Sequence, residues 1–257
     1  MRYAGRGFRL PLVIAAIVAV SVAGVATAKN AAGLPAAEKV IAKYIKAIGG
    51  KKAYLAYDSR TLTGTMSMPA AGISGGLELL AASPNRVLAR IEIEGLGTIR
   101  EGFDGEVGWS IDPMSGPQVK KGKQLAQAKD QALYEAGLFP ASIYETREVV
   151  GQVEFNGKQA WRVRLVSANG NESFAFFDVD SGLQLGAESV QETPMGSIPV
   201  TSTFSDYKEF DGVLIPTRLE QDLGPAGKQI LEFSSVTGGG VDPSVFALPA
   251  EIKALLE

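Results

Sequence analysis

The chain has 257 residues, with 25 Lys and Arg against 28 Asp and Glu and a formal net charge of −3. It contains no Cys and no His, which excludes thiol nucleophiles, disulfides, Ser-His-Asp triads and His-based zinc sites. A mildly acidic chain without a basic tract is also a poor nucleic-acid binder, so no nucleic acid is expected as a partner.

Residues 1–28 have the pattern of a secretory signal peptide. An arginine-bearing start precedes the apolar run Leu10–Val20, and Ala26-Thr27-Ala28 supplies the small residues of a cleavage site. We expect cleavage near Ala28 and export to a bacterial periplasm, where a chain without Cys has no stray thiols to oxidise. The alternative is an uncleaved anchor, because the apolar stretch is about long enough to span a bilayer.

Two short helices are predicted next. The first begins at Pro35, and its apolar residues share one face at helical spacing: Ala37, Val40, Ile41, Tyr44, Ile45 and Ile48. Gly49-Gly50 ends this helix, and Lys51–Tyr57 is the candidate for the second.

After Asp58 the apolar pattern changes to the period of two that is typical of strands. Asp104-Gly105 has the composition of a hairpin turn. We expect Asp112–Gly122 to be a loop and Gln124–Ala136 to be a helix. The strands predicted before this interruption are Arg60–Met68, Leu77–Ala82, Arg86–Glu94, Thr98–Phe103 and Val107–Ile111.

The remainder of the chain reads as consecutive strands joined by short turns. Turns of this length force sequence neighbours to pair, which predicts an antiparallel meander of about eleven strands that must curl. Residues 29–257 are therefore expected to form a single α+β domain, a strongly curved sheet with a few helices, and a closed lipocalin-type barrel is the alternative. The strands predicted here are Glu145–Phe155, Lys158–Ser167, Glu172–Asp178, Leu183–Thr193, Ile198–Phe210, Val213–Leu223 and Lys228–Thr237.

No motif points firmly to catalysis or to a bound metal. Glu92 and Glu94 fit the solvated face of a strand, and Asp104 fits a turn, so a carboxylate pair for hydrolysis is not favoured. The segment Asp178–Gly182 is half of a calcium loop, but a turn between strands explains it better. We expect no enzyme activity, no cofactor and no metal.

The aromatic residues suggest a ligand site instead. A curved sheet has more concave area than a few short helices can fill, which favours a cavity for a lipophilic guest. The alternative is a partner-binding or structural envelope module whose core is filled by its own side chains. The candidate cavity residues are Tyr44, Ile48, Trp109, Phe139, Trp161, Phe174 and Phe176.

Several segments resemble the bacterial periplasmic lipoprotein carriers of the LolA/LolB-like superfamily. They lie between about Pro35 and Pro249 and are mostly turn and core signatures. The segments that carry the resemblance are Tyr44–Gly50, Phe103–Trp109 with Pro113 and Gly116-Pro117, Phe176–Asp178 with Ser181–Leu183, Asp206-Tyr207, Gly212, Ile215–Thr217, Phe246 and Leu248-Pro249.

The resemblance implies an unclosed half-barrel with helices covering its concave face. It also implies a non-enzymatic monomer that binds a lipid or an acylated lipoprotein for envelope transport, with an envelope protein as a possible partner. The first helix would act as the lid by exchanging its apolar stripe for the guest. The core carriers hold the lid with an arginine, and Arg60, Arg86 and Arg90 are not distinguished by sequence for that role.

Overall fold

The computed structural model describes residues 33–193 and 196–257, so the predicted signal peptide lies outside the described residues. The described helices are α1 (Ala37–Ala47), α2 (Lys51–Tyr54), α3 (Gly122–Ala132) and α4 (Ala250–Lys253), with 3-10 turns η1 (Pro69–Ala71), η2 (Ala136–Leu138), η3 (Gly224–Ala226) and η4 (Pro243–Phe246). The described strands are β1 (Ser59–Met68), β2 (Ile73–Ala82), β3 (Arg86–Ile93), β4 (Gly97–Phe103), β5 (Gly108–Asp112), β6 (Gly116–Val119), β7 (Tyr144–Phe155), β8 (Lys158–Ser167), β9 (Glu172–Asp178), β10 (Gln184–Thr193), β11 (Gly196–Phe210), β12 (Val213–Asp222) and β13 (Lys228–Gly238).

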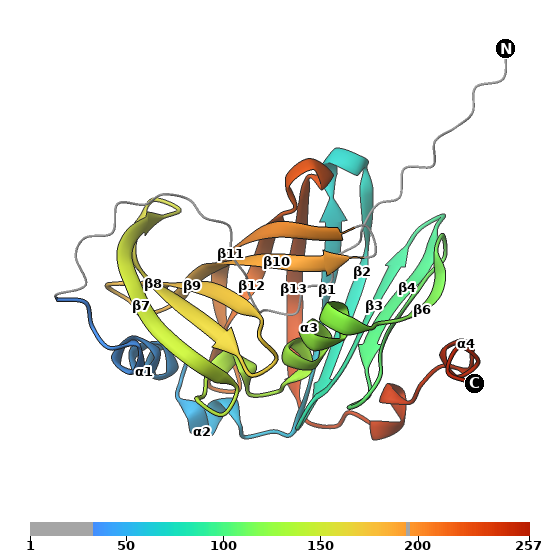
Figure 1. Cartoon of the computed structure of the whole chain (residues 1–257), viewed down its shortest axis with the longest axis horizontal. Coiled ribbons are helices and arrows are strands. Elements are labelled where there is room, and N and C mark those ends of the chain that lie inside the picture. Colours follow the sequence, from blue (N-terminus) through green and yellow to red (C-terminus); the bar gives the residue numbers. More distant parts are fainter. Residues whose placement is uncertain (1–32, 194–195) are drawn as a thin grey trace, which may run out of the picture.

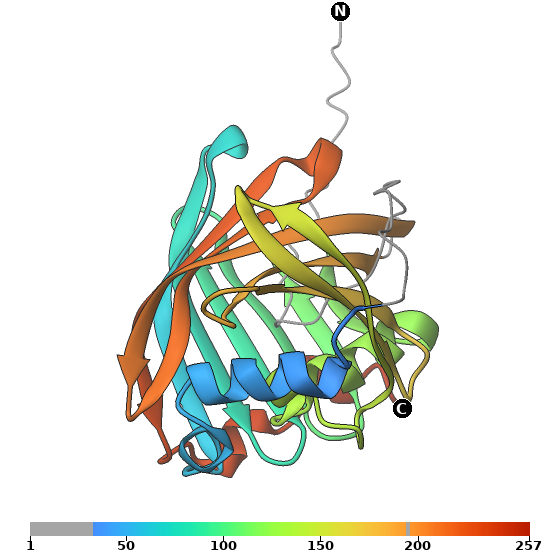
Figure 2. The same cartoon turned by 90° about the vertical axis from the view of Figure 1, so that its left-hand side faces the viewer.

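All of these strands belong to one antiparallel sheet, in the order β6-β5-β4-β3-β2-β1-β13-β12-β11-β10-β9-β8-β7. One meander, β1–β6, runs from the centre to one edge, and a second, β7–β13, returns from the other edge to the centre. The two meanders join where β1 pairs with β13. The edge strands β6 and β7 do not pair with each other, so the curved sheet stays open (Figures 1 and 2).

The predicted α+β class and the curved antiparallel sheet are confirmed, with thirteen strands in the described chain rather than about eleven. The predicted loop Asp112–Gly122 contains the additional strand β6, which pairs only with β5. A four-residue edge strand that contains Pro117 has too little alternation to be recognised in the sequence. The alternative of a closed lipocalin-type barrel is wrong, because the sheet has two free edges.

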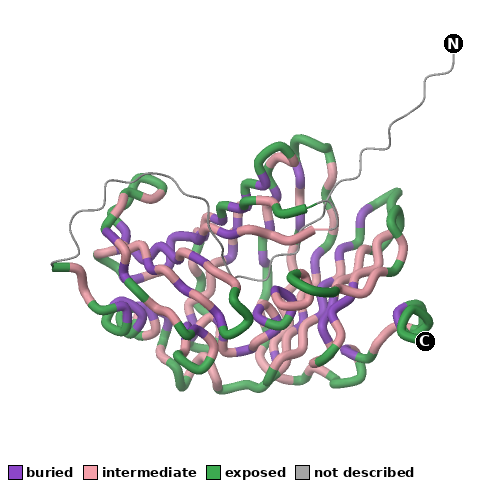
Figure 3. The backbone as a smooth tube through the Cα atoms, viewed as in Figure 1, coloured by how far each residue is buried: buried purple, intermediate pink, exposed green. Residues whose placement is uncertain are grey.

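The predicted turns explain why the strands pair with their neighbours. Asn156 and Gly157 have φ values of 50° and 77°, and Asp211 and Gly212 have 50° and 78°. Two successive residues with positive φ form the tight turn that matches the twist of a hairpin. Exposed residues gather at such turns, while buried residues run along the strands (Figure 3).

Glycine permits one close approach within the centre of the sheet. The register of β1 against β13 shifts between Thr63 and Gly64. A Cβ atom on Gly64 would lie 1.9 Å from the carbonyl oxygen of Glu232, so any other residue would push the two strands apart.

The helix α1 lies across the inner face of the β7–β9 end of the sheet (Figure 2). Its predicted stripe is confirmed: Ala37, Val40, Ile41, Tyr44 and Ile48 are buried against inward-facing residues of β7, β8 and β9. The helix ends at Ala47, just before the predicted Gly49-Gly50 stop, where the φ of Gly49 is +105°. Because side chains of β7, β8 and β9 already pack against most of the apolar face of α1, this helix forms part of the protein core.

The outer face is also partly covered. Leu88 and Trp109 are buried beneath Phe246 of η4 and Ile252 of α4, which lie outside the sheet beside β3 and β6. The strand face that carries Glu92, which we expected to be solvated, is therefore covered at Leu88. No described helix is both long enough and apolar enough to cross a membrane.

Candidate functional site: an apolar cavity beneath the helices

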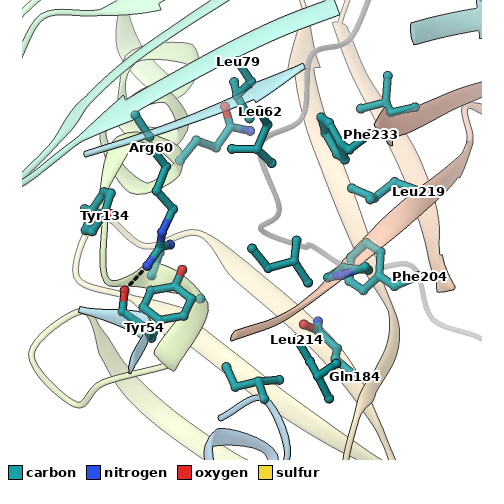
Figure 4. Close-up of a pocket in the computed structure, with 18 of the residues that line it drawn as sticks. Tyr54, Arg60, Leu62, Leu79, Tyr134, Gln184, Phe204, Leu214, Leu219 and Phe233 are labelled. Atoms are coloured by element: carbon teal, nitrogen blue, oxygen red, sulfur yellow. Dashed lines mark hydrogen bonds between the residues drawn. The ribbon is translucent and has the colours of Figure 1, made fainter. Parts of the chain in front are cut away.

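A cavity of about 180 Å³ lies between the helices and the inner face of β1, β2 and β11–β13. Its apolar wall comes from the sheet, and Figure 4 shows several of these side chains pointing into the same space. The wall includes Leu62, Leu77, Leu79, Phe204, Leu214, Leu219, Leu231 and Phe233. Period-two alternation places pairs such as Leu77 and Leu79, or Leu231 and Phe233, on one face, and the curl of the sheet makes them converge. Leu214 is five positions from Leu219 on β12, so alternation alone does not explain its place in the wall.

Arg60 marks the polar end of this cavity. Its guanidinium donates a hydrogen bond to the carbonyl oxygen of Tyr54 in α2 (Figure 4). The same group lies 3.9 Å from the ring centroid of Tyr54 and 4.7 Å from that of Tyr134. Arg60 thus links the sheet to α2 and to the segment that follows α3.

The cavity carries a single positive charge. Arg60 is the one charged side chain among the described lining residues. Burial raises the pKa of Tyr134 to about 12 and also raises the pKa of Tyr44 and Tyr207, so these phenols stay neutral at physiological pH. The site therefore combines an apolar body with one cationic group at its mouth.

The part of the wall that is easiest to move is α2. None of its four residues is buried, and its contact with residues 135–137 includes an exposed ion pair, in which Lys51 Nζ lies 3.7 Å from Glu135 Oε2. Gly137 faces the Tyr54 hydroxyl so closely that a Cβ atom there would lie 2.6 Å from it. Few buried apolar contacts in α2 imply a low cost of local opening there, and residues 133–137, of which Tyr134 and Ala136 are buried, are the segment that α2 contacts. We call α2 together with residues 133–137 the mouth segment.

The opposite wall, α3, is held firmly by buried polar contacts. Gln127 Nε2 donates to the carbonyl oxygen of Val190 at 2.7 Å, and its Oε1 accepts from the Glu192 amide at 2.9 Å. Asp130, 3% exposed, accepts hydrogen bonds from Ser167, Asn169 and Asn171 in the β8–β9 turn region. These contacts position the α3 end that lines the cavity.

The structure separates the seven predicted cavity residues into three groups. Tyr44 and Ile48 line the cavity. Phe139 and Trp161 lie behind Tyr44 in the cluster beneath α1, where the ring centroids of Tyr44 and Phe139 are 5.7 Å apart. The other three residues, Trp109, Phe174 and Phe176, face the outer side of the sheet.

The outward-facing aromatics have their own packing partners. Phe176 stacks on Phe155 with centroids 4.2 Å apart, and the Arg162 guanidinium lies 3.6 Å from the centroid of Phe174. Alternation along a strand assigns residues to two faces but does not say which face is concave. The wall residues of β11–β13 were missed, and Arg60 was not distinguished from Arg86 and Arg90, although it shares the inward phase of Leu62, Met66 and Met68.

The acidic motifs have structural roles. Asp178 Oδ1 accepts hydrogen bonds from the backbone amides of Asp180 and Ser181 at 2.8 and 2.9 Å. These bonds form the turn that the sequence predicts for Asp178–Gly182. These backbone hydrogen bonds and Lys158 lower the pKa of Asp178, although its burial acts in the opposite direction. Glu101 forms an ion pair with Lys120. Within the described residues, no three acidic side chains are grouped so that they could hold a metal ion.

Replacing Arg60 by Leu should loosen the mouth segment. The change removes a hydrogen bond from a charged donor, which contributes about 1.5–3 kcal/mol, and two cation–π contacts. We expect hydrogen exchange at the amides of Tyr54, Leu55 and Ala56 to accelerate at least tenfold, corresponding to about 1.4 kcal/mol. Arg90→Leu is the control, because Arg90 pairs with Glu78 at the surface, where ion pairs contribute little. Equal exchange in both variants would contradict the role assigned to Arg60.

No family model and no curated protein sequence matches the chain. The chain is similar in structure to a LolA superfamily protein from Nitrosomonas europaea, with 14% identity, a TM-score of 0.56 and coverage of 84% of this chain and 99% of that one. It is also similar to a putative outer membrane lipoprotein-sorting protein domain from Vibrio parahaemolyticus, with 15% identity, a TM-score of 0.52 and coverage of 86% and 99%.

A third similar structure is a DUF1329 family protein from Desulfovibrio piger, with 11% identity, a TM-score of 0.56 and coverage of 85% of this chain and 100% of that one. Identities this low establish a shared fold, and the shared feature is the open curved sheet with helices against its concave face. The predicted resemblance is therefore confirmed at the level of the fold: the chain has the LolA-like architecture.

Proposed function

We propose that this protein is a non-enzymatic carrier of the cell envelope, which binds the hydrocarbon tail of a lipid or of an acylated lipoprotein in the cavity. The observation that carries the proposal is the apolar hollow between the sheet and the mouth segment. A core filled by its own side chains would leave no such space. The LolA-like fold of the chain is consistent with this role.

The size of the hollow indicates how binding would proceed. A dry apolar cavity of about 150 Å³ is large enough to bind benzene, so the 180 Å³ cavity accepts a short apolar group without rearrangement. A long tail needs more volume, and the mouth segment is the part of the wall that can provide it. Binding is therefore expected to displace α2 and residues 133–137 while α1 and α3 stay in place.

The charge distribution gives the guest an orientation. Each methylene removed from water contributes roughly 0.8 kcal/mol, which favours placing the tail against the wall of Leu219, Leu231 and Phe233. The polar head would then lie at the mouth, beside the Arg60 guanidinium. An anionic or hydrogen-bonding head group suits this position, because Arg60 has no ion pair with any described carboxylate.

The test is native mass spectrometry of protein purified from its host envelope, followed by analysis of an organic extract. We expect a bound species of lipid mass that is lost on delipidation. The delipidated protein should then bind a fluorescent fatty acyl probe, and unlabelled lipid should displace that probe.

Two results would contradict the proposal. The first is purified protein without bound lipid that also shows no response to fatty acids, phospholipids or acylated peptides. The second is a bound lipid whose affinity is unaffected when the cavity is filled by mutation. Protein without any lipid response would favour the alternative of a partner-binding envelope module.

A further inference from the structure

A row of uncharged polar side chains lies on the inner face of the sheet, just beyond the end of the cavity. Ser202 of β11 pairs with Gln221 of β12, and Gln221 pairs with Gln229 of β13, so the three side chains are neighbours. Leu219 and Leu231, which line the cavity, are two residues away on the same strands. At about 3.3 Å per residue, this polar row is the next inward-facing layer, about 7 Å further along.

The polar row is deeply buried and incompletely hydrogen-bonded. Gln229 is 0% exposed and Gln221 is 2% exposed. Both amide atoms of Gln229 and the Oε1 atom of Gln221 lack a partner among the described residues. The one contact within the row is a long hydrogen bond of 3.4 Å, which Gln221 Nε2 donates to Ser202 Oγ. Buried amides without partners are costly and uncommon.

Another buried glutamine shows that the fold can satisfy such a group. Gln127 is 8% exposed, yet both of its amide atoms are bonded to the backbone of β10. The surroundings of the polar row are apolar instead, since Met68, Val200 and Leu223 are the buried inward-facing residues beside it. An apolar side chain would suit the position of Gln229 better if packing were its only role.

We propose that the polar row is the far end of the lipid site and that it binds a hydroxyl group at the buried end of the guest's tail. The inference rests on the proposed function. Gln229 offers an unpartnered NH2 group as donor and an unpartnered carbonyl oxygen as acceptor, and a hydroxyl both donates and accepts. A carboxylate would bring a charge to a place where the inward-facing neighbours are uncharged, and an ester oxygen could only accept.

The binding test compares a saturated fatty acid with its ω-hydroxy derivative, across a series of chain lengths, on the delipidated full-length mature protein. The two ligands differ by one oxygen at the tail end. A purely apolar cavity binds the hydroxylated tail more weakly, because the hydroxyl loses its hydration. We expect the opposite preference, at least about tenfold, at the chain length that reaches the polar row. The variant Gln229→Leu should reverse that preference, because the tail end then meets an apolar side chain in place of an unpartnered amide.

The outcomes separate this inference from the proposed function. Binding of the plain fatty acid without a preference for the ω-hydroxy form at any chain length would overturn the inference alone. Failure of both ligands to bind would overturn both. A preference that survives in Gln229→Leu would show that the hydroxyl binds elsewhere.

A stability measurement provides an independent check. Gln229→Leu should leave the melting temperature of the delipidated protein unchanged or raise it, because the substitution removes a buried amide that has no partner. Thr217→Val on β12 is the matched control, since the buried Thr217 hydroxyl donates to the Asp206 carbonyl oxygen at 2.6 Å. That variant should lower the melting temperature. A comparable loss in Gln229→Leu would mean that its amide is already satisfied within the fold, and the inference would fail.

Discussion

The variant Leu62→Trp should bind fatty acyl probes at least tenfold more weakly than the natural protein. Leu62 lines the cavity from β1 and lies near its polar end (Figure 4). An indole ring there takes up space that the tail would occupy. Exclusion of only two methylenes from the apolar wall removes about 1.6 kcal/mol of burial, which is more than a factor of ten in affinity. Probe titration by fluorescence measures the change.

The control for this prediction is Thr65→Trp on the same strand. Thr65 is exposed and shares the outward phase of β1, so its indole would lie in solvent. We expect unchanged probe affinity for this variant and native-like circular dichroism for both. Equal affinities in the two variants would place the bound tail outside the cavity.

The largest loss of stability is expected for Asp130→Ala. The Asp130 carboxylate accepts from Ser167 Oγ at 2.5 Å, from Asn169 Nδ2 at 2.6 Å and from Asn171 Nδ2. Removing it breaks three charge-assisted hydrogen bonds and leaves the buried Ser167 hydroxyl without this acceptor. Such a loss costs about 3 kcal/mol or more in the free energy of unfolding. Urea denaturation followed by tryptophan fluorescence measures it.

Lys129→Ala on the same helix serves as the control, because Lys129 is exposed and its change should stay within about 0.5 kcal/mol. The predicted consequence for function is specific. Residues 131–134 follow Asp130 and line the cavity, so Asp130→Ala should also weaken probe binding under conditions where the protein remains folded. If Asp130→Ala were as stable as Lys129→Ala, the buried network would not hold α3 in place.

Much of the architecture follows from local sequence signals. The period of two in β7–β13 and turns such as Asn156-Gly157 determine that neighbouring strands pair, and every strand predicted in that region is present. The stripe of α1 and its end at Gly49-Gly50 follow from helical periodicity and from glycine's tolerance of positive φ. These features depend on residues that are close together in the chain, so they can be predicted from the sequence.

The site depends on contacts that are distant along the chain. Arg60 meets Tyr134 across the cavity mouth, and Gln229 lies beside Gln221 because two strands pair in one register. Trp109 was expected in the cavity, but it lies on the outer face under α4. Aromatic composition could not distinguish these faces, because both bury apolar side chains.

The sequence by itself determined the class of fold, the order of the hairpins, the covering helix and the absence of cysteine and histidine chemistry. The tertiary structure alone decided which face of the sheet is concave, where a cavity remains and which arginine lies at its polar end. The physical reason is that alternation and turn propensity act between near neighbours, whereas a cavity is defined by how far a curled sheet holds its walls apart.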